Sequence, residues 1–220
     1  MWQVEHQGGL SLQILTPEER IRADRFRFAR DRDAFLTTRI ILRHLLARYT
    51  GIAAQALEFA AGERGKPRAV DPKIEFNVSH SGSISLLAFA CGAVGVDIEL
   101  IRPVVDMEAI VSQNFGPRER SQWAGVSVEE RERAFFTGWT RKEAYVKALG
   151  AGLSLPLGSF DVTITADVTP RFLNVPGWSL YDLDVSGYAA ALAVSSTVSA
   201  IRAWRLTDPI AELGKSIARP

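Results

Sequence analysis

Helical and strand-like segments follow one another in the same order twice along the 220-residue chain, and this order constrains the fold most. Residues 17–50 keep apolar side chains at helical spacing, with Thr16 as a candidate N-cap, a proline in the first turn and Gly51 at the end. Shorter strand-like pieces precede this helix at residues 2–6 and 10–15. Strand-like runs follow it at residues 57–60, 74–79, 84–91 and 94–100.

The second half opens again with helical sequence, at residues 106–124 and 127–149. Ser127 and Glu130 form a capping-box pattern, and Gly150 is a natural C-cap. Strands are then predicted at residues 160–165, 178–183, 188–194 and 200–206. The sequence therefore predicts an α+β fold of two similar halves packed side by side, residues 1–102 and 103–220.

Composition excludes several classes of protein. With 47% hydrophobic residues the chain can bury a sizeable core, and its net charge of +1 favours neither nucleic acid nor a membrane as partner. The single cysteine, Cys91, excludes an intramolecular disulfide, and three histidines are too few to favour a Cys/His zinc cluster. No signal peptide and no apolar run of about 20 residues are evident, so we expect a cytoplasmic protein.

The stretch "VGVDIEL", residues 94–100, alternates aliphatic residues with a glycine and two acids. On a strand, Asp97 and Glu99 share one face with Cα atoms about 6.6 Å apart, so both carboxylates can reach a common point. A hard cation such as Mg²⁺ would relieve their repulsion, because it takes oxygen ligands from carboxylates and phosphates. The alternative is an edge strand whose acidic face lies in water.

The stretch "WTRKEAYVKALGAGL", residues 139–153, places Glu143 and Lys147 four residues apart on one helix face. Glu143 is a candidate third oxygen ligand or a base, and Lys147 a candidate for neutralising a phosphate. The alternative is an ordinary surface ion pair of about 0.3–0.5 kcal/mol.

Two further stretches carry candidate phosphate ligands. "GERGKP", residues 62–67, lacks the glycine spacing of a phosphate-cradling P-loop, but its turn could present Lys66 to an anion or to water. In "FNVSHSG", residues 76–82, Ser79 and His80 end a strand at a turn. A Ser–His nucleophile pair is disfavoured, since adjacent strand residues point apart and no G-x-S-x-G elbow is present.

These four stretches occur together, in an order that resembles the Sfp-type (surfactin-type) 4′-phosphopantetheinyl transferases. The resemblance covers residues 22–162 and includes "RFRFARDRDAFLTTRIILRHLL", similar to the family's arginine-rich helix. It implies a reaction: the phosphopantetheine arm of coenzyme A passes to a serine of an apo carrier protein, and adenosine 3′,5′-bisphosphate leaves. It also implies an active site in the cleft between the halves.

The resemblance further implies a role for each site residue. Asp97, Glu99 and Glu143 would hold Mg²⁺, with Mn²⁺ as an alternative, and Glu143 could be the base for the incoming serine. Lys147 would lie at the pyrophosphate and, with Asp97 and Glu143, form the catalytic set. The residues implied to hold the phosphates of coenzyme A are Arg22, Arg39, Lys66, Ser79, His80 and Lys147.

Other implications concern partners. The loop at residues 114–119, "NFGPRE", is expected to face the carrier, and the protein is expected to be a monomer because both halves lie in one chain. The identity of the carrier stays open among those of fatty-acid, polyketide, peptide and siderophore synthesis, the last three belonging to secondary metabolism. Two rival functions use the same residues: a Mg²⁺-dependent phosphohydrolase acting on coenzyme A or another nucleotide, and a binding module without catalysis.

Overall fold

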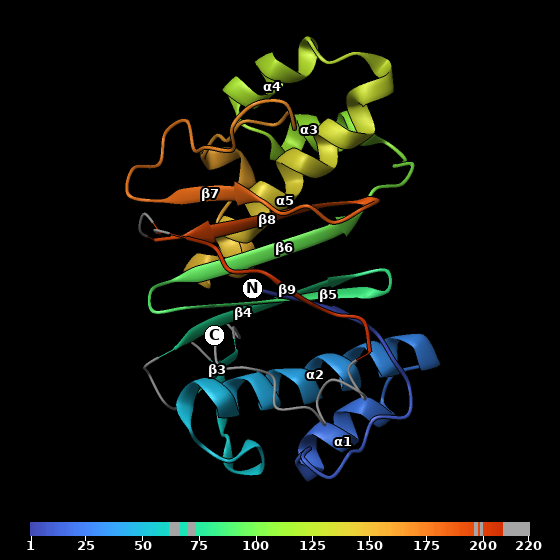
Figure 1. Cartoon of the computed structure of the whole chain (residues 1–220). Coiled ribbons are helices and arrows are strands. Elements are labelled where there is room, and N and C mark those ends of the chain that lie inside the picture. Colours follow the sequence, from blue (N-terminus) through green and yellow to red (C-terminus); the bar gives the residue numbers. More distant parts are fainter. Residues whose placement is uncertain (62–66, 70–73, 196–197, 199, 209–220) are drawn as a thin grey trace.

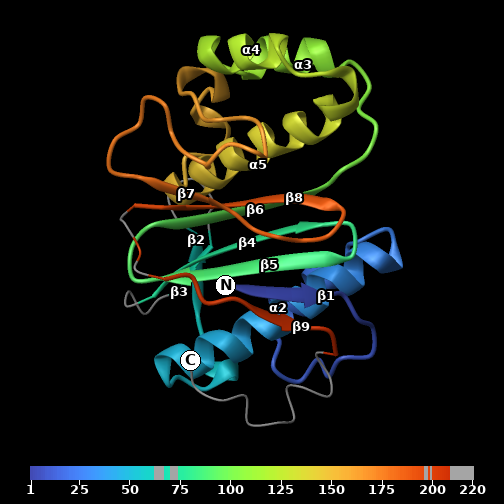
Figure 2. The same ribbon diagram turned by 45° about the horizontal axis from the view of Figure 1, so that its top comes forward.

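The computed structural model describes residues 1–61, 67–69, 74–195, 198 and 200–208. Two β-sheets lie face to face, and each is covered on its outer side by one long helix (Figure 1). The layers run from α2 (Ala29–Thr50) through the N-terminal and C-terminal sheets to α5 (Arg131–Leu149), as Figure 2 also shows. The predicted α+β fold is confirmed, and each sheet has one long helix on its outer side.

The N-terminal sheet has the strand order β4-β5-β1-β9, and β9 runs parallel to β1 while the other neighbours are antiparallel. Its strands are β4 (Glu75–Ser81), β5 (Ile84–Ala90), β1 (Trp2–Glu5) and β9 (Trp204–Leu206). The C-terminal sheet is antiparallel, with the order β6-β8-β7. Its strands are β6 (Val94–Leu100), β8 (Tyr188–Val194) and β7 (Ser179–Asp182).

Smaller elements flank these layers. A separate pair of short strands is formed by β2 (Phe59–Ala61) and β3 (Pro67–Ala69). The remaining α-helices are α1 (Pro17–Asp24), α3 (Met107–Asn114) and α4 (Pro117–Ala124). Short 3₁₀ helices are η1 (Ala54–Ala56), η2 (Val128–Glu130), η3 (Gly152–Ser154) and η4 (Leu157–Ser159). Among the described residues, no helix combines the length and apolarity needed to cross a membrane.

Strands are exchanged across the predicted junction between residues 102 and 103. β6 precedes that junction but pairs with β8, and β9 lies beyond it but pairs with β1. Each sheet therefore takes one strand from the other side of the junction, and the sheets do not divide the chain there.

The first predicted helix is two helices in the structure. Thr16 is the N-cap of α1, as predicted, and forms a complete capping box with Glu19, but α1 ends at Asp24. The chain then folds back, and Glu19 pairs with buried Arg43 of α2 at 2.9 Å. This ion pair needs the two helices side by side. Gly51 ends α2 in the left-handed conformation (φ 78°), as expected.

Several other predictions differ from the structure. The helix predicted from residue 127 begins at Arg131, since Ser127 makes no side-chain cap, and residues 160–165 form only an isolated bridge. Residues 10–15 form no strand and pack as a loop on the N-terminal part of α2. Residues 106–124 form two helices, because Gly116-Pro117 starts α4 with proline in its first turn.

Candidate active site

The acidic face of β6 points at α5, and Gly95 sets the distance between them. Val94, Val96 and Ile98 belong to the core between the sheets, so the alternate residues of β6 face the helix. A Cβ atom on Gly95 would lie 2.0 Å from the carbonyl oxygen of Ala144 and 2.3 Å from the backbone nitrogen of Ala148. Only glycine permits this approach, which places Asp97 beside the Glu143–Lys147 turn of α5.

Side chains from three elements meet at Asp97. The ammonium group of Lys147 donates to Oδ1 of Asp97 at 2.5 Å and to Oγ of Ser79 at 2.9 Å. The Ser79 hydroxyl in turn donates to the same Asp97 oxygen at 2.8 Å. Asp97 is 3% exposed, and the Lys147 side chain is 30% exposed. The lysine thus neutralises a buried carboxylate while part of it remains open to solvent or to a ligand.

Glu99 and Glu143 lie near enough to Asp97 for the charges to interact. Burial raises the pKa of Glu143 above its ordinary 4.5, and the charges of Asp97 and Glu99 raise it further against the opposing effect of Lys147. Burial and Asp97 likewise raise the pKa of Glu99, opposed by the Ser81 hydroxyl and by Lys147. The three predicted metal ligands therefore act on one another through space.

The fit of these acids to a metal ion rests on one atom. Oδ2 of Asp97 is buried and has no hydrogen-bond partner in the part of the chain that the structure describes. A buried carboxylate oxygen without a donor is costly, and a cation would satisfy it. The described residues contain no group of three or more His, Cys, Asp or Glu side chains already drawn together as a metal site. The acids fit a divalent cation that also takes oxygens from a ligand.

A ladder of side chains joins the two sheets at this point. β4 and β6 are edge strands of their sheets, and backbone N–H groups of β6 donate to side chains of β4 rather than to its backbone. The pairs are Val96 to Asn77 Oδ1 (2.8 Å), Ile98 to Ser79 Oγ (3.4 Å) and Leu100 to Ser81 Oγ (3.0 Å). The Ser81 hydroxyl also donates to Oε2 of Glu99 at 2.9 Å.

Ser79 differs from the expectation that it binds a phosphate. A serine hydroxyl has one proton and two lone pairs, and all three are used here by Asp97, Lys147 and the N–H of Ile98. The side chain is buried and does not line the cavity described next. We therefore assign Ser79 to positioning Asp97 and Lys147.

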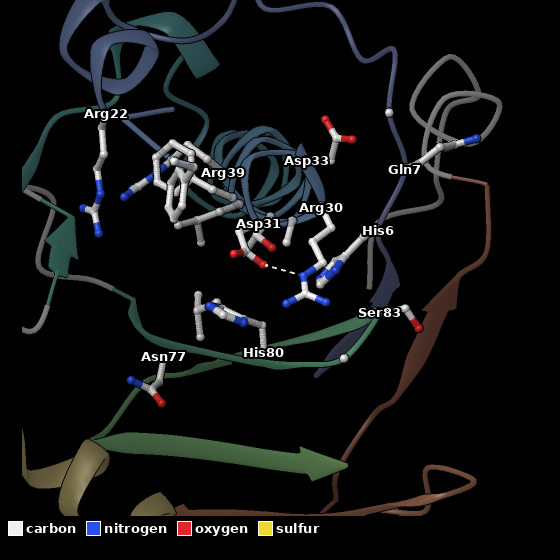
Figure 3. A pocket seen from close by; sticks show the side chains of 18 of the residues that line it. His6, Gln7, Arg22, Arg30, Asp31, Asp33, Arg39, Asn77, His80 and Ser83 are labelled. Carbon is white, nitrogen blue, oxygen red and sulfur yellow. Dashed lines mark ion pairs between the residues drawn. The ribbon is translucent and has the colours of Figure 1, made fainter. Parts of the chain in front are cut away.

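A cavity of about 1080 Å³ lies between α1, α2, β4 and the segment that follows β1. Its lining includes three of the predicted phosphate ligands, Arg22, Arg39 and His80. Figure 3 shows the two arginines together at one end, and His80 reaching in from β4. Asn77 also lines the cavity, two residues along β4 from Ser79, so this strand connects the cavity to the acidic cluster.

Aromatic rings hold the two arginines. The guanidinium of Arg22 lies 5.2 Å from the centre of the Phe35 ring, and that of Arg39 lies 4.8 Å from the centre of Phe59. Arg39 also pairs with Glu19 at 3.4 Å, yet its buried Nη1 has no partner among the described residues. The unpaired donor leaves Arg39 with hydrogen-bonding capacity for an anion.

His6 is a cavity residue that the sequence did not single out. Its Nε2 lies 2.8 Å from Oγ of Ser85, and its ring meets His80 edge-on with centroids 6.4 Å apart. Burial and the neighbouring His80 lower the pKa of His6 to about 4. His6 is thus neutral near pH 7 and adds no positive charge to the cavity.

Two other predicted residues lie elsewhere. Lys66 falls outside the described residues. The loop at residues 114–119 does not present its aromatic and acidic residues to a carrier, because Phe115 and Glu119 are fully buried. Glu119 accepts from Lys142 Nζ at 2.6 Å and caps the backbone of Gly116.

The sequence contains a signal for Asn77 and Ser81, which were not among the predicted site residues. Asn77, Ser79 and Ser81 alternate with Phe76 and Val78, so β4 has a polar face although it lies in the interior. Such a face on a buried strand requires polar partners. The N–H groups of the neighbouring edge strand β6 are those partners.

The chain matches two family models of 4′-phosphopantetheinyl transferases. Residues 2–92 match the family model of the 4′-phosphopantetheinyl transferase N-terminal region, and residues 93–193 match that of the 4′-phosphopantetheinyl transferase superfamily. The two models meet at the turn before β6.

Curated relatives carry the same description. The chain is 34% identical to the 4′-phosphopantetheinyl transferase HetI of a Nostoc species over 77% of its own length and 73% of that protein. It is 32% identical to the 4′-phosphopantetheinyl transferase Sfp of Bacillus subtilis over 71% and 69% of the two chains. A solved holo-(acyl-carrier-protein) synthase from Bacillus anthracis in complex with CoA aligns with 46% of this chain and 93% of its own, at 18% identity and a TM-score of 0.36. The matched relatives and family models confirm the resemblance to the Sfp-type enzymes, and the chain belongs to the 4′-phosphopantetheinyl transferase family.

Proposed function

We propose that this transferase moves the 4′-phosphopantetheine arm of coenzyme A to a serine of an apo carrier protein with the help of Mg²⁺, for which Mn²⁺ can substitute. The observation that carries the proposal is the meeting of Ser79, Asp97 and Lys147 from β4, β6 and α5. The strand that carries Ser79 also carries the cavity residues Asn77 and His80.

Asp97, Glu99 and Glu143 would hold the metal, with the partnerless Oδ2 of Asp97 as the best-supported ligand atom. When bound, Mg²⁺ would neutralise negative charge on the pyrophosphate of coenzyme A. Lys147 acts on the same charge: its ammonium group can turn from Asp97 to a phosphate oxygen and stabilise the leaving bisphosphate.

Glu143 is our proposed base for the carrier serine. In the metal-free site, burial and two neighbouring carboxylates raise its pKa, so there this carboxylate accepts a proton more readily than an exposed glutamate. The serine hydroxyl transfers its proton to Glu143 as its oxygen bonds to the phosphorus of the pantetheine phosphate. The bond from that phosphorus to the bridging oxygen breaks, and adenosine 3′,5′-bisphosphate leaves.

Arg22, Arg39 and His80 would bind the phosphates of coenzyme A in the cavity. The unpaired Nη1 of Arg39 and the aromatic support of both guanidinium groups favour an anionic ligand. Lys66 stays a prediction for the same role. We further propose a cytoplasmic monomer, since α5 and the strands that build the site belong to one chain.

Release of adenosine 3′,5′-bisphosphate tests the proposal. Coenzyme A and Mg²⁺ are incubated with the protein, with and without an apo carrier, and the nucleotide products are separated by chromatography. We expect stoichiometric release only when the carrier is present. Release without a carrier would identify a hydrolase and contradict the proposed function, as would equal release in excess chelator.

A further inference from the structure

Ser81 makes two hydrogen bonds that tie neighbouring parts of β6 together. Its Oγ accepts the backbone N–H of Leu100 at 3.0 Å and donates to Oε2 of Glu99 at 2.9 Å. One hydroxyl on β4 thus holds both the backbone and the adjacent carboxylate of β6. The Glu99 side chain is thereby fixed relative to its own strand.

Glu99 needs such a restraint more than Asp97 does. Asp97 is short, nearly fully buried and held by both Lys147 and Ser79. Glu99 is half-buried near the end of β6, and its longer side chain has more rotamer freedom to lose on binding a cation. A partner that orders the carboxylate beforehand lowers that entropic cost.

We propose that Ser81 is a positioning residue that holds the Glu99 carboxylate for the divalent cation of the transfer reaction. This inference rests on the proposed function, because it presumes that Glu99 is a metal ligand. The second partner of a ligating carboxylate commonly affects metal affinity as much as 10- to 100-fold.

Ser81 can be tested more cleanly than Ser79. The hydrogen bonds of Ser79 involve Asp97 and Lys147, so its replacement also disturbs the ion pair. Those of Ser81 involve Glu99 and the N–H of Leu100. Asn77 supplies a matched control, because it accepts the N–H of Val96 in the same ladder through an amide oxygen.

The experiment titrates Mn²⁺ into the intact protein by calorimetry for the parent, Ser81→Ala, Ser81→Thr and Asn77→Ala. Ser81→Ala should weaken Mn²⁺ binding about 10- to 100-fold. Ser81→Thr retains the hydroxyl and should bind like the parent. Asn77→Ala removes one ladder bond and, among the described residues, no hydrogen bond to a carboxylate, so it should lower the melting temperature without changing Mn²⁺ affinity.

Transfer kinetics supply the second readout. Ser81→Ala should raise the Mg²⁺ concentration for half-maximal transfer by the same factor and leave the KM for coenzyme A unchanged. Parental Mn²⁺ affinity and parental Mg²⁺ requirement in Ser81→Ala would overturn the inference, as would equal losses in Ser81→Thr or Asn77→Ala. A parent protein that transfers the arm in excess chelator would instead refute the metal role itself, and the inference with it.

Discussion

Lys147 of α5 and Asp97 of β6 pair at 2.5 Å, across the boundary between the helix and the sheet that it covers. The sequence suggested a different partner for the lysine, Glu143 on its own helix face. The observed partner is nearly fully buried, so removing the lysine alone would leave a buried charge without compensation. This geometry changes what substitution of Lys147 should do.

Lys147→Ala should lower kcat/KM by about 100-fold or more, because a group that stabilises the leaving phosphate is lost. It should also destabilise the metal-free protein by more than the ~1 kcal/mol expected of a surface pair, since Asp97 keeps its buried charge. A double-mutant cycle with Asp97→Asn, measured by urea unfolding, should give a coupling energy of about 0.5–3 kcal/mol. If the losses of unfolding free energy in the two single variants add up to the loss in the double variant, the two charges do not interact.

Gly95→Ala should destabilise the protein by about 1–3 kcal/mol or more, because its Cβ would overlap backbone atoms of Ala144 and Ala148 that cannot move independently of α5. The shift of α5 should also lower transfer activity. The matched control is Gly92→Ala, whose Cβ would lie 3.1 Å from the movable hydroxyl of Ser195. Thermal melts and transfer rates that are equal in the two variants would contradict the close packing.

Mg²⁺ should stabilise the protein more at pH 7.5 than at pH 5. The pKa values of Glu99 and Glu143 are raised in the folded protein, first by burial. The metal-free folded state therefore loses stability as the pH rises above 4.5 through the raised values. A cation replaces the proton and restores that stability.

The measurement compares melting temperatures with and without Mg²⁺ at both pH values. A double variant, Glu99→Gln with Glu143→Gln, serves as the control and should show little response to Mg²⁺ at either pH. A response in the parent that is equal at pH 5 and 7.5 would contradict the assignment of these carboxylates as ligands.

Lys142→Met should cost about 3–5 kcal/mol of unfolding free energy, since Glu119 would keep a buried charge without its partner. Burial already raises the pKa of Glu119, and Lys142 opposes that rise. The control is Arg131→Met, which breaks the exposed pair with Glu108 and should cost about 0–1 kcal/mol. If urea unfolding gave Lys142→Met and Arg131→Met similar losses of unfolding free energy, burial would not decide the strength of these ion pairs.

Much of the site could be predicted because local patterns encode it. The strand at residues 94–100 is confirmed with its predicted bounds, and alternation alone placed Asp97 and Glu99 on one face. The helix carrying Glu143 and Lys147 ends at Leu149, followed by Gly150 in the left-handed conformation, as predicted. In both elements the side-chain period agrees with the tertiary structure, but the predicted capping box at Ser127 does not form, and α5 begins at Arg131 after the 3₁₀ turn η2.

The rest depended on partners distant in the sequence. Residues 160–165 alternate like a strand, and Val162 and Ile164 are buried, but only an isolated bridge from Val162 to Phe172 forms. Their N–H groups donate instead to the side chains of Glu119 and Gln122. The ladder from β6 to β4 has the same character, since side chains replace the backbone of a neighbouring strand. The alternation of side chains in the sequence does not show whether the backbone N–H groups will bond to side chains or to the backbone of a neighbouring strand.

Intact-protein mass spectrometry of an apo carrier tests the central claim most directly. The carrier is incubated with the protein, coenzyme A and Mg²⁺, beside reactions with Glu143→Gln or with excess chelator. We predict that the carrier gains the mass of one phosphopantetheine group, only in the complete reaction with the parent protein. An unmodified carrier across a panel of fatty-acid, polyketide and peptide carriers, or equal modification in the presence of chelator, would contradict the account.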